Sequence, residues 1–89
     1  MTFTVLLHPK AAKELEKLEA GIRARIVDRA RELRQDPAAL GKTLSQSDFY
    51  SLRVGDYRVI YQLDYERKQV VILFVGHRSK VYDDFSKML

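Results

Sequence analysis

Two arginines, Arg53 and Arg58, occupy positions in this 89-residue chain from which chemistry can be inferred. They lie in the stretch Phe49–Tyr61, FYSLRVGDYRVIY, which predicts two strands joined by a two-residue turn at Gly55–Asp56, because glycine supplies the positive φ of tight hairpin turns. That turn fixes the register and sets Arg53 opposite Arg58. Facing guanidiniums repel unless an anion lies between them, and phosphate fits arginine best. The alternative is that both side chains extend into water.

Further cationic and aromatic groups are expected beside this pair. The apolar run Val70–Val75 predicts a strand that follows the polar turn 64–69. If it runs antiparallel to the preceding strand, with Leu63 near Val70, then Arg58 falls near Val75–His77, and the next segment emerges beside the two arginines. The residues predicted to gather there are Arg53, Arg58, His77, Arg78, Lys80 and Tyr82.

Such a cationic site would stabilise the extra negative charge of a phosphodiester undergoing cleavage. We expect no metal and no cofactor, because His8 and His77 are far apart and Asp83–Asp84 lack a third partner. The chain has no cysteine and no glycine-rich phosphate loop. Metal-free cleavage of RNA by its own 2′-OH remains, and it needs a base, cations around the phosphate and an acid for the leaving oxygen.

The elements that would position these residues begin with a β-rich stretch and two amphipathic helices. Thr2–Leu7 predicts a short strand, and Pro9 suits the first turn of a helix. Ala20–Gly21 interrupts the helical pattern, and a second helix is expected to end before Asp36–Pro37. Its arginine-rich outer side is either a solvated face or a support for a nucleic-acid backbone.

The remaining chain completes an α+β domain spanning residues 1–89. Residues 37–48 predict a loop with at most one short turn of helix. Tyr57 and Tyr61 fall on the helix-covered face of the second hairpin strand, and we interpret both as structural. We expect the order β-α-α-β-β-β, a helical hairpin packed on a small, mostly antiparallel four-stranded sheet, and a short C-terminal helix or turn.

Composition favours an acidic partner and an intracellular location. The formal charge is +4 and the pI is near 9.5, which is typical of domains that bind nucleic acid. No N-terminal signal peptide is apparent, and no apolar stretch approaches the ~20 residues that span a bilayer. We therefore expect a soluble, cytoplasmic protein with no membrane partner.

Two motifs resemble those of the RelE toxins in the RelE/ParE superfamily. They are Leu-Arg-x-Gly-x-Tyr-Arg-x-x-Tyr from Leu52 to Tyr61, and Val-Gly-His-Arg-x-x-x-Tyr from Val75 to Tyr82. The resemblance implies the toxin of a toxin–antitoxin pair, which enters the ribosomal A site and cuts mRNA without metal, leaving a 2′,3′-cyclic phosphate. It also implies a cognate RelB-like antitoxin, bound in a heterotetramer or other hetero-oligomer.

The resemblance assigns roles to four residues. Arg53 matches a basic residue on the first hairpin strand, and Arg58 matches the arginine that contacts the scissile phosphate. Arg78 matches the arginine proposed to assist the leaving group. Tyr82 matches a tyrosine that stacks on or orients the substrate, although its spacing also suits a packing residue.

The general base is left open by one departure from the family pattern. RelE toxins often place a lysine, the candidate base, at the position of Ser51, which we assign to substrate binding. His77 could take the 2′ proton instead, or it could be an ordinary surface histidine. Lys80 is the other candidate base, and its alternative role is a contact with ribosomal RNA phosphates.

The antitoxin is expected to be a mostly helical, partly disordered chain that folds as it wraps the toxin. It would block activity by packing on the sheet or by displacing Val81–Leu89. Two other functions stay open: inhibition of DNA gyrase, as in the ParE branch of the superfamily, and binding of RNA or ribosomes without catalysis.

Overall fold

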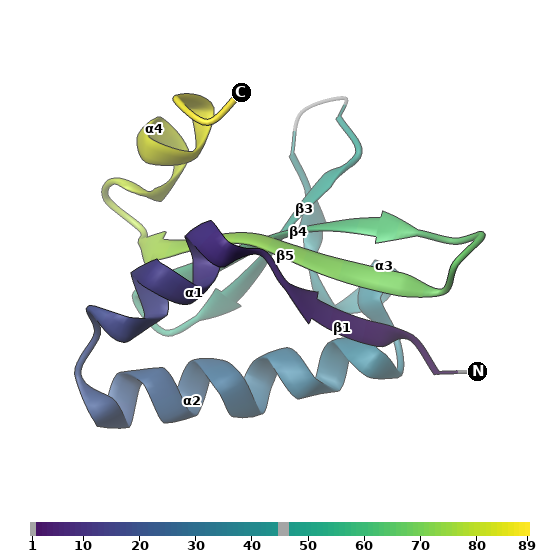
Figure 1. The fold of residues 1–89 in the computed structure, drawn as a ribbon, viewed down its shortest axis with the longest axis horizontal. Coiled ribbons are helices and arrows are strands. Elements are labelled where there is room, and N and C mark those ends of the chain that lie inside the picture. The colour runs from purple at the N-terminus through teal and green to yellow at the C-terminus, as the bar shows by residue number, and fades with distance from the viewer. Residues whose placement is uncertain (1, 45–46) are drawn as a thin grey trace.

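The computed structural model describes residues 2–44 and 47–89, in which helices flank a twisted sheet (Figure 1). The chain forms, in order, β1 (Thr4–Leu7), α1 (Pro9–Glu16), α2 (Ala20–Arg31), the 3-10 turn η1 (Glu32–Arg34), α3 (Pro37–Leu40), β2 (Lys42–Thr43), β3 (Phe49–Val54), β4 (Tyr57–Asp64), β5 (Gln69–His77) and α4 (Val81–Ser86). The helix α3 is the short turn of helix expected in the loop.

The sheet has the order β1-β5-β4-β3-β2, with β1 parallel to β5 and every other pair antiparallel. The predicted α+β fold is confirmed, but the sheet has five strands where four were expected. The additional strand is β2, whose Lys42 and Thr43 pair with Ser51 and Tyr50. Two residues are too few to show the alternation from which strands are predicted.

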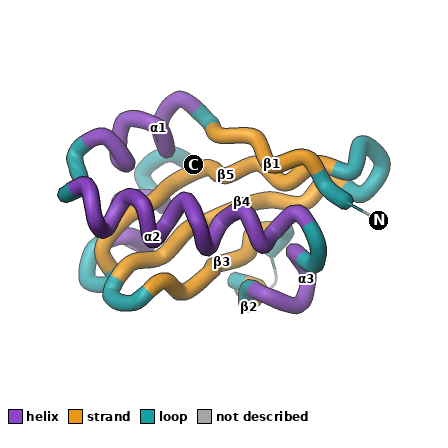
Figure 2. Tube along the Cα trace, turned by 90° about the horizontal axis from the view of Figure 1, so that it is seen from below, coloured by secondary structure: helices purple, strands orange, loops and turns teal. Residues whose placement is uncertain are grey.

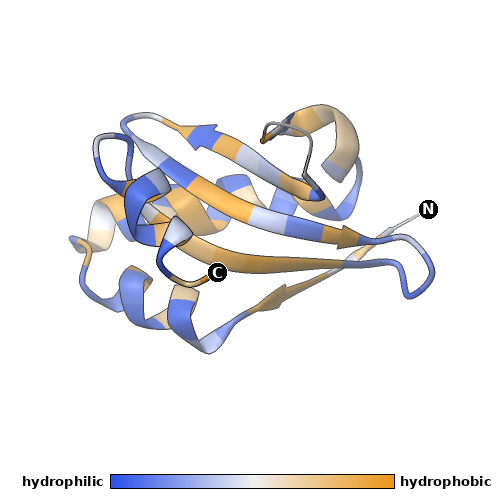
Figure 3. Ribbon diagram, turned by 90° about the horizontal axis from the view of Figure 1, so that it is seen from above, coloured by the Kyte–Doolittle hydropathy of each residue, from blue (hydrophilic) through white to orange (hydrophobic). Residues whose placement is uncertain are grey.

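Helices cover the two faces of the sheet unequally. α1 and α2 lie on one face, and the short α4 lies on the other (Figures 1 and 2). Successive side chains of β4 point to opposite faces of the sheet. Val59 and Tyr61 pack with Ile26 in the larger core, whereas Ile60 packs with Phe85 in the smaller core under α4. β5 is hydrophobic along most of its length because it is covered on both faces (Figure 3).

The break between α1 and α2 falls earlier than predicted. Glu19 is the N-cap of α2, and its carboxylate accepts a hydrogen bond of 2.8 Å from the backbone N–H of Gly21. Ala20 and Gly21 are therefore the first two residues of the helix, and the prediction that they interrupt it was wrong. A side-chain acceptor that satisfies a free N–H group compensates for the weak helix propensity of glycine.

Tyr61 anchors the larger core, as its structural interpretation required. It is fully buried, its hydroxyl donates a 2.6 Å hydrogen bond to the carbonyl of Pro37, and its ring stacks on Tyr50. A Cβ added at Gly41 would overlap the Tyr61 hydroxyl, so glycine is required for this close approach. Burial disfavours the phenolate and raises the pKa of Tyr61 to about 12.

None of the helices within residues 2–44 and 47–89 combines the length and the hydropathy needed to cross a membrane.

Candidate functional site

The β3–β4 hairpin has the register expected from its turn. Gly55 has a φ of +58°, and Arg53 lies opposite Arg58. On its other side Arg58 pairs with Gly76 of β5, inside the predicted neighbourhood. One irregularity in the β4–β5 pairing, between Ile60 and Tyr61, shifts the register by one residue, as a β-bulge does.

A hollow of about 480 Å³ opens beside this hairpin, and it unites segments that are distant in sequence. Arg58 comes from β4, His77 ends β5, and Tyr82 comes from α4. The residues that line the hollow are Arg58, His77, Arg78, Ser79 and Tyr82. The structure therefore brings together four of the residues predicted to gather there.

The two arginines of the hollow are both held by the hairpin turn. Arg58 Nη1 donates hydrogen bonds to the carbonyls of Gly55 and Tyr57, at 2.9 and 2.8 Å. Arg78 donates its backbone N–H to the carbonyl of Asp56 at 2.7 Å, and its Nε lies 3.7 Å from Asp56 Oδ1. The backbone hydrogen bond and the ion pair both tie Arg78 to the turn residue Asp56.

Arg53 lines a different cleft, although it lies opposite Arg58 in the register. This cleft, of about 330 Å³, separates the hairpin from α2, and its lining residues are Arg25, Asp28, Arg29, Glu32, Arg53, Val54 and Gly55. The expected anion trap between Arg53 and Arg58 is therefore not preformed, because Arg58 turns back onto carbonyl oxygens of the hairpin.

Ser51 joins the site through Tyr82. Ser51 is buried, with 8% of its surface exposed, and its Oγ lies 3.0 Å from the Tyr82 hydroxyl. Tyr82 is 43% exposed, so it is not an ordinary packing residue of the smaller core. That role belongs to its neighbours Val81 and Phe85, which are buried.

His77 and Lys80 differ in their relation to the hollow. The His77 ring stands edge-on to Tyr57, and its Nδ1 lies 2.8 Å from Ser79 Oγ. Lys80 is the exposed N-cap residue of α4 and is absent from the lining of the hollow. Of the two candidate bases, only His77 is next to Arg58 and Arg78.

Sequence reasoning missed Asp56 and Ser79, which contact Arg78 and His77 through side chains. The hairpin register contained a signal for Asp56, because it placed the turn beside the segment that follows β5. No group of three or more potential metal ligands occurs among the described residues.

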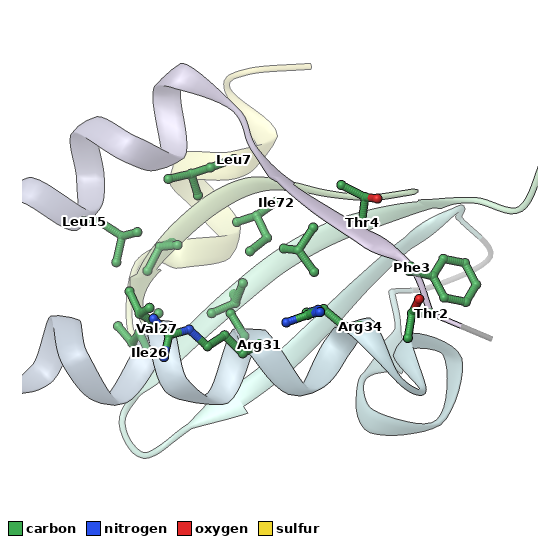
Figure 4. A pocket seen from close by; sticks show the side chains of 14 residues that line it. Thr2, Phe3, Thr4, Leu7, Leu15, Ile26, Val27, Arg31, Arg34 and Ile72 are labelled. Atoms are coloured by element: carbon green, nitrogen blue, oxygen red, sulfur yellow. The ribbon is translucent and has the colours of Figure 1, made fainter. Parts of the chain in front are cut away.

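A second concave surface lies on the opposite face of the sheet. It is a groove of about 510 Å³ between β1 and α2, lined mainly by apolar side chains, with Arg31 and Arg34 along it (Figure 4). Leu7 and Val27 are among its walls and are 46% and 36% exposed.

Comparisons with known proteins show the family to which this chain belongs. Residues 5–82 match the family model described as "ParE toxin of type II toxin-antitoxin system, parDE". The chain is also 38% identical over 85 residues to Toxin RelG of Mycobacterium tuberculosis, covering 92% of this chain and 98% of the relative. The chain belongs to the RelE/ParE superfamily of type II toxins. Toxin RelE of the same organism is 34% identical over 83 residues, covering 90% of this chain and 86% of the relative.

Solved structures of RelE proteins share the fold. The toxin–antitoxin complex RelBE2 of M. tuberculosis contains a chain with 36% identity and a TM-score of 0.83, covering 89% of this chain and 94% of that one. A mutant of the E. coli toxin RelE in the free state gives 28% identity and a TM-score of 0.79, covering 100% and 99%. The resemblance to RelE toxins inferred from the two motifs is confirmed.

Proposed function

We propose that this RelE-family chain is a ribosome-dependent mRNA endoribonuclease that inhibits translation. The observation that carries the proposal is the hollow in which Arg58, Arg78 and Tyr82 meet beside His77. Two guanidiniums suit a doubly coordinated phosphate, and a partly exposed tyrosine ring suits an unstacked base. The hollow therefore offers cations for the phosphate and a surface for a base, with His77 beside them as a candidate general base.

The reaction we propose needs only RNA and side chains. The ribose 2′-oxygen attacks the adjacent phosphorus, the bond from phosphorus to the 5′-oxygen breaks, and the products are a 2′,3′-cyclic phosphate and a 5′-hydroxyl. Arg58 and Arg78 stabilise the charge that develops on the non-bridging oxygens. We assign His77 to accept the 2′ proton and Arg78 to stabilise the negative charge on the leaving 5′-oxygen, which takes its proton from water.

Arg53 is proposed to bind RNA outside the reaction centre. Its cleft also contains Arg25 and Arg29, and Arg25 and Arg53 have no ion-pair partner among residues 2–44 and 47–89. Asp28 and Glu32 also line the cleft, and they pair with Arg31 and Arg29. Arg25 and Arg53 are therefore the side chains proposed to bind backbone phosphates, each neutralised phosphate making binding more sensitive to salt. Lys80, exposed at the start of α4, is proposed to add a further phosphate contact.

The proposal is tested by translating a defined mRNA in a cell-free system and mapping fragment ends by primer extension. Wild type should give cuts within codons, and Arg78→Ala should reduce them at least about 100-fold. Arg67→Ala is the matched control: Arg67 is also an exposed arginine paired with an aspartate, at 3.8 Å, but it lies beyond the far end of β4. Absence of cleavage by wild type, or equal loss in both variants, would contradict the proposal.

We further propose that a RelB-like antitoxin neutralises the chain, since solved neighbours include RelB–RelE complexes from M. tuberculosis, E. coli and Pyrococcus horikoshii. The groove between β1 and α2 fits an amphipathic antitoxin segment, because its walls are apolar. Arg31 and Arg34 would pair with acidic residues of that segment. A hetero-oligomer would bury the exposed Leu7 and Val27.

Hydrogen exchange on the toxin–antitoxin complex tests this partner and its site. Protection should rise in β1 and in α2, which form the groove. If the antitoxin instead displaces α4, exchange in residues 81–89 should become faster in the complex. No change in β1 or α2 would contradict docking in the groove, and no change in 81–89 would contradict displacement.

Gyrase inhibition is the second candidate, favoured by the ParE description of the matching family model. It does not require the groups of the hollow. A supercoiling assay with purified gyrase separates the two functions: inhibition that persists in Arg78→Ala, with no mRNA cleavage by wild type, would favour the ParE activity.

A further inference from the structure

We infer that Ser51 is a positioning residue that holds the Tyr82 ring in place for an RNA base. The inference rests on the proposed function, because Tyr82 contacts substrate only if the hollow binds RNA. It assigns a task to the position at which RelE toxins often carry a lysine. The serine hydroxyl is too weak an acid to be ionised at neutral pH, so its use here is hydrogen bonding.

Ser51 is fixed by the sheet around it. It lies in β3, paired with Lys42 of β2 on one side and with Ile60 of β4 on the other. Its side chain is on the α4 face, is nearly buried, and has the Tyr82 hydroxyl as its hydrogen-bond partner at 3.0 Å. A short hydroxyl on a central part of the sheet is a rigid point of attachment.

Tyr82 is consequently held at both ends. Its backbone is fixed because the adjacent Val81 is fully buried and Phe85, one turn later, is 5% exposed against the smaller core. Its hydroxyl is fixed by Ser51. Since a tyrosine side chain has two main rotatable bonds, restraint at both ends fixes the plane of the ring.

The restraint leaves the ring available for binding. Tyr82 is 43% exposed and lines the hollow with Arg58 and Arg78. A base that stacks on this ring would be set at a constant orientation relative to the arginines. Stacking on an aromatic ring tolerates every base, so Ser51 would affect the alignment of the reacting phosphate rather than codon choice.

A double-mutant cycle on the rate of mRNA cleavage tests the inference. Ser51→Ala and Tyr82→Phe should each lower kcat/KM about tenfold, and the double variant should lose no more than either single one, because both remove the same hydrogen bond. Ser51→Thr should retain activity. Ser86→Ala is the control, since it removes an exposed α4 hydroxyl that donates to the Asp83 carbonyl within the same helix. A multiplicative, about 100-fold loss in the double variant would overturn the inference.

A readout independent of cleavage separates this inference from the proposed function. In NMR spectra of the free protein, Ser51→Ala should shift and broaden the ring resonances of Tyr82 and leave those of Tyr61 unchanged. Unchanged Tyr82 resonances would overturn the positioning role whether or not the protein cuts RNA. Shifted resonances together with an inactive wild type would retain the Ser51–Tyr82 contact and reject the nuclease.

Discussion

The two faces of the sheet differ in what their side chains do, although they alternate along the same strands. On the face covered by α1 and α2, residues such as Ile26, Val59 and Tyr61 are almost completely buried. On the α4 face a small apolar cluster is bordered by the exposed Arg78 and Tyr82. The larger core therefore accounts for most of the buried surface, and the face with exposed cationic and aromatic side chains is the one to which we assign the proposed cleavage.

The largest effect is expected from the larger core. Ile26→Ala should lower the free energy of unfolding by about 2–5 kcal/mol, because Ile26 is 1% exposed and its truncation leaves a cavity. Ile26→Val should cost only about 0.5–1.5 kcal/mol. Urea denaturation measures both, and a loss below about 1 kcal/mol for Ile26→Ala would show that this face is not the source of stability.

Removal of a guanidinium from the α4 face should lower the rate of mRNA cleavage and leave the stability of the fold almost unchanged. Arg58→Ala should reduce mRNA cleavage about 100- to 1,000-fold, equivalent to about 2.7–4 kcal/mol of transition-state stabilisation. The side chain is half-buried, and its hydrogen bonds to the carbonyls of Gly55 and Tyr57 are exposed and part-buried. Because water can replace the lost donor at these carbonyls, the free energy of unfolding should change by under about 1 kcal/mol. Cleavage kinetics and urea denaturation should be measured on the same preparation of Arg58→Ala. A variant that loses activity because it unfolds would contradict the separation of stability and activity between the two faces.

The same substitution, tyrosine to phenylalanine, can be made on each face of the sheet, at Tyr61 and at Tyr82, and its cost in stability compared. Tyr61→Phe should cost about 1–3 kcal/mol of stability, because it deprives the Pro37 carbonyl of its buried donor. Tyr82→Phe should cost less, since its hydroxyl bond is part-buried and the ring is exposed. Thermal or urea unfolding measures the difference, and equal costs would contradict the division of roles.

Alkaline pH should reveal the buried tyrosine. The pKa of Tyr61 is raised from the ordinary 10.0 to about 12 by burial. A raised folded-state pKa gives stability that is complete below the unfolded value, so this contribution should decline as pH rises from about 10 to 12. The stability difference between wild type and Tyr61→Phe, followed by urea denaturation across that range, should shrink; a constant difference would exclude this burial effect.

The smallest effect is expected at the hairpin turn. Gly55→Ala should cost about 1 kcal/mol, because alanine is strained at a φ of +58°. Gly55→Asn should be tolerated better, since asparagine adopts left-handed conformations more readily. Urea denaturation measures the free energy of unfolding of both variants. If Gly55→Ala and Gly55→Asn are equally stable, the turn relaxes to another conformation.

Backbone register was predictable from the sequence because it follows from local rules. A two-residue turn at Gly55–Asp56 sets Arg53 opposite Arg58. The antiparallel return then brings Arg78 and Tyr82 to the same end of the sheet. Helix spacing and strand alternation likewise predicted which faces are buried.

The contacts of individual polar side chains were not predictable, because they depend on neighbours distant in sequence. Arg53 lines a cleft beside α2, and Ser51 meets Tyr82 across 31 residues. The start of α2 was misplaced because the Glu19 carboxylate caps it, and β2 was missed because it spans only two residues. Each case depends on a contact that periodicity does not encode.

The most direct test asks whether the α4 face cuts RNA through the ribose 2′-oxygen. It uses a ribosome-bound mRNA with one 2′-deoxynucleotide placed immediately 5′ of the mapped cut. We expect the all-ribose message to be cut and the deoxy message to be resistant at that bond while remaining sensitive at other codons. Equal cleavage of the two messages at that bond would contradict the account.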